Sequence, residues 1–153
     1  MRFSRQLSVL GLAALLFFLA PLAGRAEMIS INAAKVNMRS GPGADYPVSW
    51  QLGRGYPLVK IKTQGQWIKV QDFEGDSGWV YGSLTAKKPH MVVKEKLVNV
   101  RSGPGKGYKV ICQAKYGVVF RTLKRQGGLA GWVKVRHGNG PTGWVKRSLL
   151  WGW

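Results

Sequence analysis

The protein has 153 residues, and its 24 Lys or Arg against 6 Asp or Glu give a formal net charge of +18 at pH 7. Such a field attracts anionic polymers, although charge alone does not name the polymer. A single Cys excludes an internal disulfide, so packed side chains must hold the fold together.

Residues 1–26 have the composition of an export signal. Two arginines precede a largely apolar run over residues 7–20, and a proline follows that run. Gly24 and Ala26 then place small residues three and one positions before Glu27, where we expect cleavage. An uncleaved anchor is the alternative, but the run is shorter than the roughly 20 residues that cross a bilayer. The sequence therefore predicts an exported protein, periplasmic or extracellular, with no stable membrane anchor after signal cleavage.

Beyond residue 30 the sequence repeats one unit. VNMRSGPG at 36–43 returns as VNVRSGPG at 98–105, an offset of 62 residues that Tyr46 and Tyr108 also keep. Three extra residues, 128–130, then enter the second copy, after which the motifs G-W-V and S-L match at an offset of 65. A repeat that stays in register over roughly 50 residues indicates two copies of one domain.

The repeat divides the mature chain into two domains and a short linker. We expect domain 1 over residues 30–86, a charged, proline-containing linker over residues 87–92 and domain 2 over residues 93–151. The mature sequence up to Ala86 has 6 basic and 5 acidic residues, whereas the sequence from Lys87 onward has 15 basic and 1 acidic. The second domain therefore produces nearly all of the positive field.

Neither unit has the pattern of a helix, because Gly and Pro recur every few residues. Short alternations of apolar and polar residues occur instead at 36–39, 58–62, 67–70 and 78–81. Five or so short strands per unit, joined by close turns, are typical of a small and strongly bent barrel. The sequence predicts an all-β protein of two tandem small barrels, preceded by an N-terminal signal helix.

The last two strands of the first unit predict the register of a hairpin. If Ile68 and Val80 face the core opposite each other, the three-residue loop 73–75 ends in Gly, which is a common hairpin connection. The other face of the hairpin then carries two opposed pairs, Trp67 with Tyr81 and Lys69 with Trp79.

The second unit gives the same register, with Val133 opposite Val145 and a loop at 138–140. Its other face carries two opposed pairs, Trp132 with Lys146 and Lys134 with Trp144. Opposed side chains lie about 5 Å apart, so an ammonium can rest on an indole face with a gain of roughly 0.5–1 kcal/mol. Both units are therefore expected to present a surface of Trp and Lys.

Two interpretations of this surface stay open. In the first, Trp79 and Trp144 only cover the outer face of a very small sheet, with lysine stems laid over them. In the second, Trp67, Tyr81 and Trp132 form part of an apolar platform. Sugar rings or peptide backbone would stack on that platform while carboxylates meet the adjacent cations.

An arginine closes a strand in each unit, immediately before the turn sequence Ser-Gly-Pro-Gly. This arginine either binds a ligand or hydrogen-bonds carbonyls of the folded-back loop, and it should recur at one place in each barrel. The candidate ligand-binding residues are Trp67, Lys69, Tyr81, Trp132, Lys134, Lys146, Arg39 and Arg101.

The sequence offers little for catalysis or metal binding. Cys112 and His137 could form a nucleophile pair, but Cys112 aligns with a core tryptophan position and His137 with a hairpin end. An acidic trio, Asp72, Glu74 and Asp76, lies in a hairpin loop and has no counterpart in the second copy. A loop of mixed charge needs no ion. We therefore expect no enzyme, no metal and no cofactor.

The ordered motifs V-N-[MV]-R-S-G-P-G, G-x-W-[IV]-K-V and G-W-V-x-x-S-L resemble the bacterial SH3-like (SH3b) domain family, here as a tandem pair behind an export signal. The resemblance covers both units, about three quarters of the chain. It implies a barrel of the SH3 type. It also implies a role in binding peptidoglycan or other envelope components, usually as a targeting module beside a catalytic domain.

We therefore expect a non-catalytic module that binds the cell envelope, with peptidoglycan as its polymer and the basic second unit adding electrostatic attraction. One alternative is a protein-interaction adaptor for an exported partner. Another is charge-driven binding of an anionic polymer, with no specific recognition of nucleic acid. The sequence does not indicate an oligomeric state.

Overall fold

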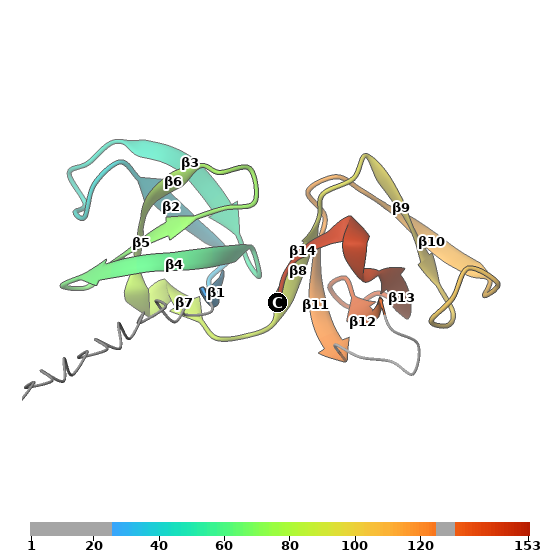
Figure 1. Cartoon of the computed structure of the whole chain (residues 1–153). Helices are drawn as coiled ribbons and strands as arrows, with labels where there is room; N and C mark the ends of the chain where they lie inside the picture. The colour runs from blue at the N-terminus through green and yellow to red at the C-terminus, as the bar shows by residue number, and fades with distance from the viewer. Residues whose placement is uncertain (1–25, 125–130) are drawn as a thin grey trace, which may run out of the picture.

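The computed structural model describes residues 26–124 and 131–153. The predicted signal helix, except for Ala26, and the predicted insertion at 128–130 lie outside the described residues. Within those residues the chain is all-β, and two sheets of seven strands form two barrels in tandem (Figure 1). None of the described segments is a helix with the length and apolarity needed to span a membrane.

The first barrel contains seven strands in the sheet order β3-β2-β6-β5-β4-β1-β7. Their bounds are β1 Glu27–Ile31, β2 Lys35–Arg39, β3 Val48–Gly53, β4 Pro57–Gln64, β5 Trp67–Gln71, β6 Ser77–Tyr81 and β7 Thr85–Ala86. One turn of 3-10 helix, η1 (Gly82–Leu84), joins β6 to β7. The four alternating stretches of the sequence are strands β2, β4, β5 and β6, as predicted.

The second barrel repeats the same order as β10-β9-β13-β12-β11-β8-β14. Its elements are β8 His90–Val93, β9 Leu97–Arg101, β10 Val110–Lys115, β11 Val119–Lys124, β12 Trp132–Arg136, β13 Thr142–Lys146, η2 Arg147–Leu149 and β14 Leu150–Gly152. The matching order confirms that the repeat builds one fold twice. Strand β8 begins at His90, so residues 90–92 of the expected linker belong to the second sheet. Strand β1 likewise begins three residues before the expected start of domain 1.

Both hairpin registers are as predicted. Trp67 lies opposite Tyr81 and Lys69 opposite Trp79 in the first barrel. The second barrel opposes Trp132 to Lys146 and Lys134 to Trp144. The loops differ in detail, because the residue with left-handed φ is the last of three in the first loop, Gly75, and the first of three in the second, Gly138. Only glycine takes such a φ without strain.

Each barrel has its own apolar core. Met38, Leu58, Val70 and Val80 are fully buried in the first, and the second is filled mainly by valines with Met91 and Leu150. The inward alternation on β5, β6, β12 and β13 supplies much of each core, because side chains point to one face at every second residue.

The RSGPG sequence folds back onto a tyrosine. The ring of Tyr46 lies so close to Gly41 that a Cβ at that position would stand 2.2 Å from the ring. Arg39 closes the loop, since its Nη1 donates to the carbonyl of Tyr46 at 2.7 Å. The second barrel repeats this bond from Arg101 to the carbonyl of Tyr108 at 2.9 Å. The structure therefore confirms that the arginine holds the loop at the same place in both barrels.

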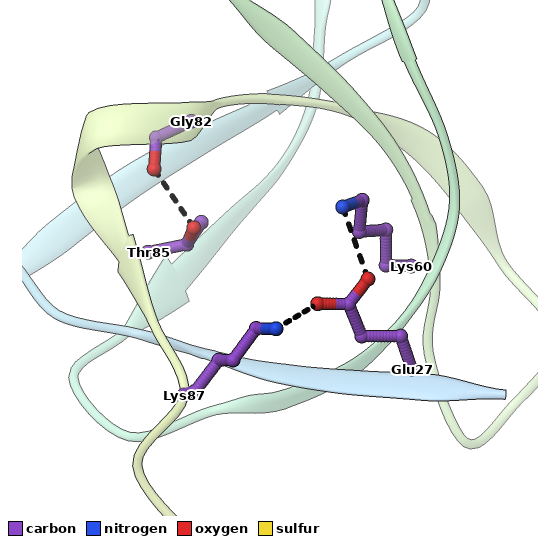
Figure 2. Close-up of polar contacts among 5 residues, drawn as sticks. All are labelled: Glu27, Lys60, Gly82, Thr85 and Lys87. Atoms are coloured by element: carbon purple, nitrogen blue, oxygen red, sulfur yellow. Dashed lines mark hydrogen bonds and ion pairs between the residues drawn. The ribbon is translucent and has the colours of Figure 1, made fainter. Parts of the chain in front are cut away.

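Strand β1 is fixed at its start by a carboxylate between two ammonium groups (Figure 2). The Glu27 carboxylate lies 3.0 Å from Nζ of Lys60 on β4 and 2.6 Å from Nζ of Lys87, just after β7. These two lysines lower the pKa of Glu27 below its usual value. Nearby, the Thr85 hydroxyl donates to the carbonyl of Gly82 at 2.8 Å and closes η1.

The two barrels contact each other through aromatic rings. Phe73, in the β5–β6 loop, has its ring centroid 5.4 Å from that of Tyr116 and 6.3 Å from that of Trp151 on β14. The Tyr116 hydroxyl also donates to the Glu74 carboxylate, which raises the pKa of Tyr116 to about 12. In Figure 1 strand β14 accordingly lies on the side of the second barrel that faces the first.

Candidate binding grooves

A groove in the first barrel, called groove 1 here, brings together three of the candidate residues. Arg39 reaches it from β2, Trp67 from β5 and Tyr81 from β6. The Trp67 and Tyr81 rings meet edge to face with centroids 5.5 Å apart. The groove has a volume of about 390 Å³, and its polar lining also includes Lys35, Asn37 and Gln51.

The second barrel has a groove at the corresponding place, called groove 2. Arg101 from β9, Trp132 from β12 and Lys146 from β13 line it, together with Asn99 and Lys106. Its volume is smaller, about 200 Å³. Seven lining positions of groove 1 thus return in groove 2 at the offsets of the repeat. Two of them change residue, Lys35/Leu97 and Tyr81/Lys146, and five keep it. The five are Val36/Val98, Asn37/Asn99, Arg39/Arg101, Trp67/Trp132 and Leu84/Leu149.

The polar lining is held in place by neighbouring strands. The Asn37 side-chain oxygen accepts a hydrogen bond from Nε2 of Gln51 at 3.2 Å, and Asn99 accepts the equivalent bond from Gln113 at 2.9 Å. Each arginine uses one nitrogen to hold its loop and keeps further N–H donors on the same guanidinium. The grooves therefore combine a half-buried indole, a fixed guanidinium and an ordered amide.

The lysines opposite Trp79 and Trp144 do not line these grooves. Lys134 lies over the Trp144 ring, with Nζ 5.9 Å from the centroid, as the sequence predicts. In the first barrel Lys69 lies opposite Trp79 as predicted, but Lys62 is the lysine whose Nζ lies over the ring, 5.4 Å from the centroid. A β-bulge between Lys60 and Lys62 shifts β4 and brings the Lys62 side chain over the ring.

A family comparison agrees with this doubled architecture. The family model described as bacterial SH3 domain matches twice, over residues 32–87 and residues 94–152. These matches cover most of the chain and follow the two sheets. The chain belongs to the bacterial SH3 domain family.

Relatives of these two SH3 domains include proteins named for cell-wall amidases. The chain is 28% identical over 144 residues to YrvJ of Bacillus subtilis, whose name describes an N-acetylmuramoyl-L-alanine amidase. The match covers 87% of this chain and 27% of YrvJ. The chain is also 44% identical over 46 residues to LytH of Staphylococcus epidermidis, which is named as a cell wall amidase. That match covers 29% of this chain and 16% of LytH. The chain thus spans about a quarter or less of these relatives.

Among solved structures, the chain is similar to an NlpC/P60 family protein from Bacillus cereus. The TM-score is 0.39 at 13% identity, over 83% of this chain and 56% of that one. NlpC2 from Trichomonas vaginalis gives a TM-score of 0.37 at 12% identity, over 83% of this chain and 48% of that one.

Sequence reasoning missed part of the groove lining in both SH3 domains. Asn37, Gln51 and Lys35 of groove 1 and Lys106 of groove 2 were not among the candidate residues. The signal was present for the asparagines, because Asn37 and Asn99 belong to the repeated V-N-x-R-S-G-P-G motif. Lys106 could not be found from the repeat, since Ala44 occupies its position in the first copy.

The second SH3 domain also has an apolar cavity that the sequence did not predict. It holds about 380 Å³ and is lined by Cys112 and His137 together with apolar side chains that include Phe120. Cys112 is exposed, so its expected place in the core is wrong. It lies opposite the buried Val100, but on β10, which is the edge strand of the sheet, where no further strand covers it.

The acidic trio of the first SH3 domain forms a hydrogen-bonded turn. One carboxylate oxygen of Asp72 accepts the backbone N–H of Glu74 at 3.0 Å and that of Asp76 at 2.9 Å. The three carboxylates have ligand atoms within 4.8 Å of one another. Burial and the nearby Asp72 raise the pKa of Tyr56, which hydrogen-bonds to that carboxylate. The Asp72 carboxylate thus stabilises the β5–β6 loop that carries Phe73 to the second barrel.

Proposed function

We propose that the protein is an exported, non-catalytic binding module for the bacterial cell envelope, with peptidoglycan as its polymer. The observation that carries the proposal is the groove that recurs in both SH3 domains, with an indole from one strand and a guanidinium from another. The names of YrvJ and LytH support the same class of ligand. Export rests on the predicted signal at residues 1–26.

The groove chemistry suits a polymer of sugars and short peptides. An indole face accepts the apolar face of a sugar ring or a peptide plane, while guanidinium and ammonium groups bind carboxylates. Each contact alone is weak. Two grooves on one chain increase retention, because the second contact forms at a high effective concentration once the first has formed.

Retention on purified, protein-free cell wall tests this proposal. The full chain should sediment with the wall at low salt, and Trp67→Ala combined with Trp132→Ala should reduce the bound fraction strongly. Trp50→Ala is the matched control, because Trp50 is an exposed indole, 54% accessible, outside both grooves. Recovery of the unaltered chain entirely in the supernatant at low salt would contradict the proposal.

The charge asymmetry favours one second candidate, binding of an anionic polymer through charge alone. In that case retention should fall steeply with salt and should not depend on the two groove tryptophans. A protein-interaction adaptor makes a different prediction. A protein partner from an envelope extract would still be captured after the wall has been digested, whereas a wall ligand would be lost.

A further inference from the structure

The two grooves differ at the position opposite the tryptophan. In groove 1, Tyr81 pairs with Trp67, and the two rings meet edge to face. In groove 2, Lys146 pairs with Trp132 and is exposed. The same strand position therefore offers an aromatic ring in one SH3 domain and an ammonium group in the other.

The loop beside each groove differs in the same direction. Ala44 and Asp45 of the first barrel correspond to Lys106 and Gly107 of the second. Lys106 lines groove 2, so a cation stands where the first barrel has a methyl group, and the adjacent negative charge is absent. Groove 2 thus collects three cationic side chains, from Arg101, Lys106 and Lys146. Groove 1 has two, from Arg39 and Lys35, and Leu97 takes the place of Lys35 in groove 2.

No carboxylate balances these three cations. The only acidic residue from Lys87 onward is Glu95, and within residues 26–124 and 131–153 no acidic side chain forms an ion pair with Arg101, Lys106 or Lys146. Arg101 donates one N–H to the Tyr108 carbonyl and keeps further donors. A ligand oxyanion would therefore meet several positive donors that have no competing anionic partner.

We propose that groove 2 is a site for an acidic sugar, in which Trp132 stacks on the ring and the three cations bind its carboxylate or phosphate. Groove 1, with Tyr81 in place of Lys146 and two cations instead of three, favours an acidic sugar less strongly. This inference rests on the proposed wall binding and gives the second SH3 domain the stronger preference for an acidic sugar. Charge-assisted hydrogen bonds to an oxyanion are about twice as strong as neutral ones, which supplies the discrimination.

Nuclear magnetic resonance of the full chain can test each groove separately, because Trp67 and Trp132 each give one indole N–H signal. N-acetylmuramic acid and N-acetylglucosamine are a matched pair, since they share the ring and differ by a carboxylate-bearing group. N-acetylglucosamine 1-phosphate supplies the phosphate arm, and inorganic phosphate supplies an anion without a ring. The Trp132 signal should shift saturably with the two acidic sugars. The neutral sugar should bind at least threefold more weakly, as judged by its dissociation constant.

Two substitutions fix the assignment to groove 2. Lys146→Tyr, which gives groove 2 the residue of groove 1, should weaken acidic-sugar binding about three- to fivefold, and Lys106→Ala should act in the same direction. Lys109→Ala is the control. It removes the same charge from the same loop, but Lys109 does not line the groove. A dispersed amide spectrum shows that each variant is folded.

Several results would overturn the inference. One is that the Trp132 signal responds equally to the acidic and the neutral sugars. Another is that inorganic phosphate alone shifts this signal as much as the acidic sugars do. A third is that Lys109→Ala and Lys106→Ala weaken acidic-sugar binding to the same extent. A stronger response of Trp132 to carboxylate than to phosphate would identify the acid. If Trp132 does not prefer acidic sugars but the chain is still retained on the wall, the proposed function stands and this inference fails. If Trp132 responds to acidic sugars but the chain is not retained on the wall, the proposed function fails and the assignment of groove 2 stands.

Discussion

A missing side chain at position 143 lets β13 lie close to β9. A Cβ on Gly143 would stand 2.3 Å from Cγ1 of Val100 and 3.1 Å from the carbonyl oxygen of Arg101. Neither atom can move away freely, because Val100 is a β-branched core residue, 2% exposed, and the carbonyl belongs to a paired strand. The glycine of the G-W-V motif is therefore required by packing.

We expect Gly143→Ala to lower the free energy of unfolding by about 1–3 kcal/mol, the usual cost of overpacking. Gly107→Ala is the matched control, since a Cβ there meets nothing within 4 Å. Its free energy of unfolding should stay within about 0.5 kcal/mol of the original. Urea unfolding followed by tryptophan fluorescence measures both variants, and equal stabilities would contradict the packing argument.

His90 makes the stability of the fold depend on pH in the acidic range. Its ring is half-buried against Gly55, and Nδ1–H donates to the Lys88 carbonyl at 3.1 Å. Burial, with smaller contributions from Arg121 and Lys88, lowers the pKa of His90 below its usual value of 6.5. The unfolded chain therefore binds this proton more readily than the folded chain does.

The contribution of His90 to stability should be fully present above pH 6.5 and should be lost as the pH falls below that value, toward the lower folded pKa. Thermal unfolding between pH 7.5 and pH 5 measures this slope. His90→Gln, which cannot titrate, should flatten the part of the slope that His90 causes. An unchanged slope in His90→Gln would show that other groups produce it.

The residue pattern predicted which side chains share a face, but not how far each lies from the edge of the sheet. Trp67, Tyr81, Trp132 and Lys146 were placed correctly because side chains alternate strictly along a strand. Cys112 was assigned to the core because it aligns with Trp50, but both residues are exposed, since β10 and β3 are edge strands with no neighbour on their outer side. Exposure at an edge depends on the sheet order, which the alternation does not contain.

At the scale of elements, two ion pairs secure the first residue of β1. It pairs with β4 from Glu27↔Lys60 to Ser30↔Pro57, and the Glu27 carboxylate also binds Lys87. The sequence predicts cleavage immediately before Glu27, so a chain cut there would keep the whole strand. The two ammonium groups would then secure the first residue of the mature protein.

Glu27→Gln should therefore increase amide hydrogen exchange in β1 at low salt. The difference from the original protein should shrink in about 1 M salt, where charges are screened within about 3 Å. Because the pKa of Glu27 is lowered, its contribution should be present at neutral pH and lost as the pH falls through the lowered value. Glu95→Gln, an exposed glutamate with no ion pair among the described residues, is the control and should leave β1 exchange unchanged.

Element boundaries and bulges mark the limit of what the sequence could predict. The repeated motifs indicated β2, β4, β5 and β6 because their alternation is regular, whereas β7 has only two residues and too little pattern to recognise. The bulge between Lys60 and Lys62 has no signature in the alternation. It decides that Lys62 rather than Lys69 lies over Trp79.

At the scale of the whole molecule, the β5–β6 loop of the first barrel holds the second barrel. Tyr56 and Phe73 approach with centroids 6.3 Å apart, and Phe73 continues the contact to Tyr116 and Trp151. The hydrogen bond from Tyr116 to Glu74 adds a polar link beside these rings. The corresponding loop of the second barrel, Gly138-Asn139-Gly140, has no aromatic residue, so only one of the two copies can make this contact.

Phe73→Ala should release the two barrels from each other while each core stays folded, because Phe73 belongs to neither core. We expect a larger radius of gyration in small-angle X-ray scattering and separate unfolding transitions for the two barrels. Trp50→Ala removes a larger, exposed ring from β3 and should change neither measurement. An unchanged radius in Phe73→Ala would show that the aromatic contact does not hold the barrels together.

Alkaline pH should open the same contact through Tyr116. Its pKa is raised from 10 to about 12, chiefly by the hydrogen bond that its neutral hydroxyl donates to Glu74. A raised acid pKa means that the contribution is fully present below pH 10 and is lost as the pH rises toward 12. The radius of gyration should therefore increase over that window. Tyr116→Phe keeps the ring but has no proton to lose, so its radius should not respond to pH there. A response equal to that of the original protein would assign the opening to other groups.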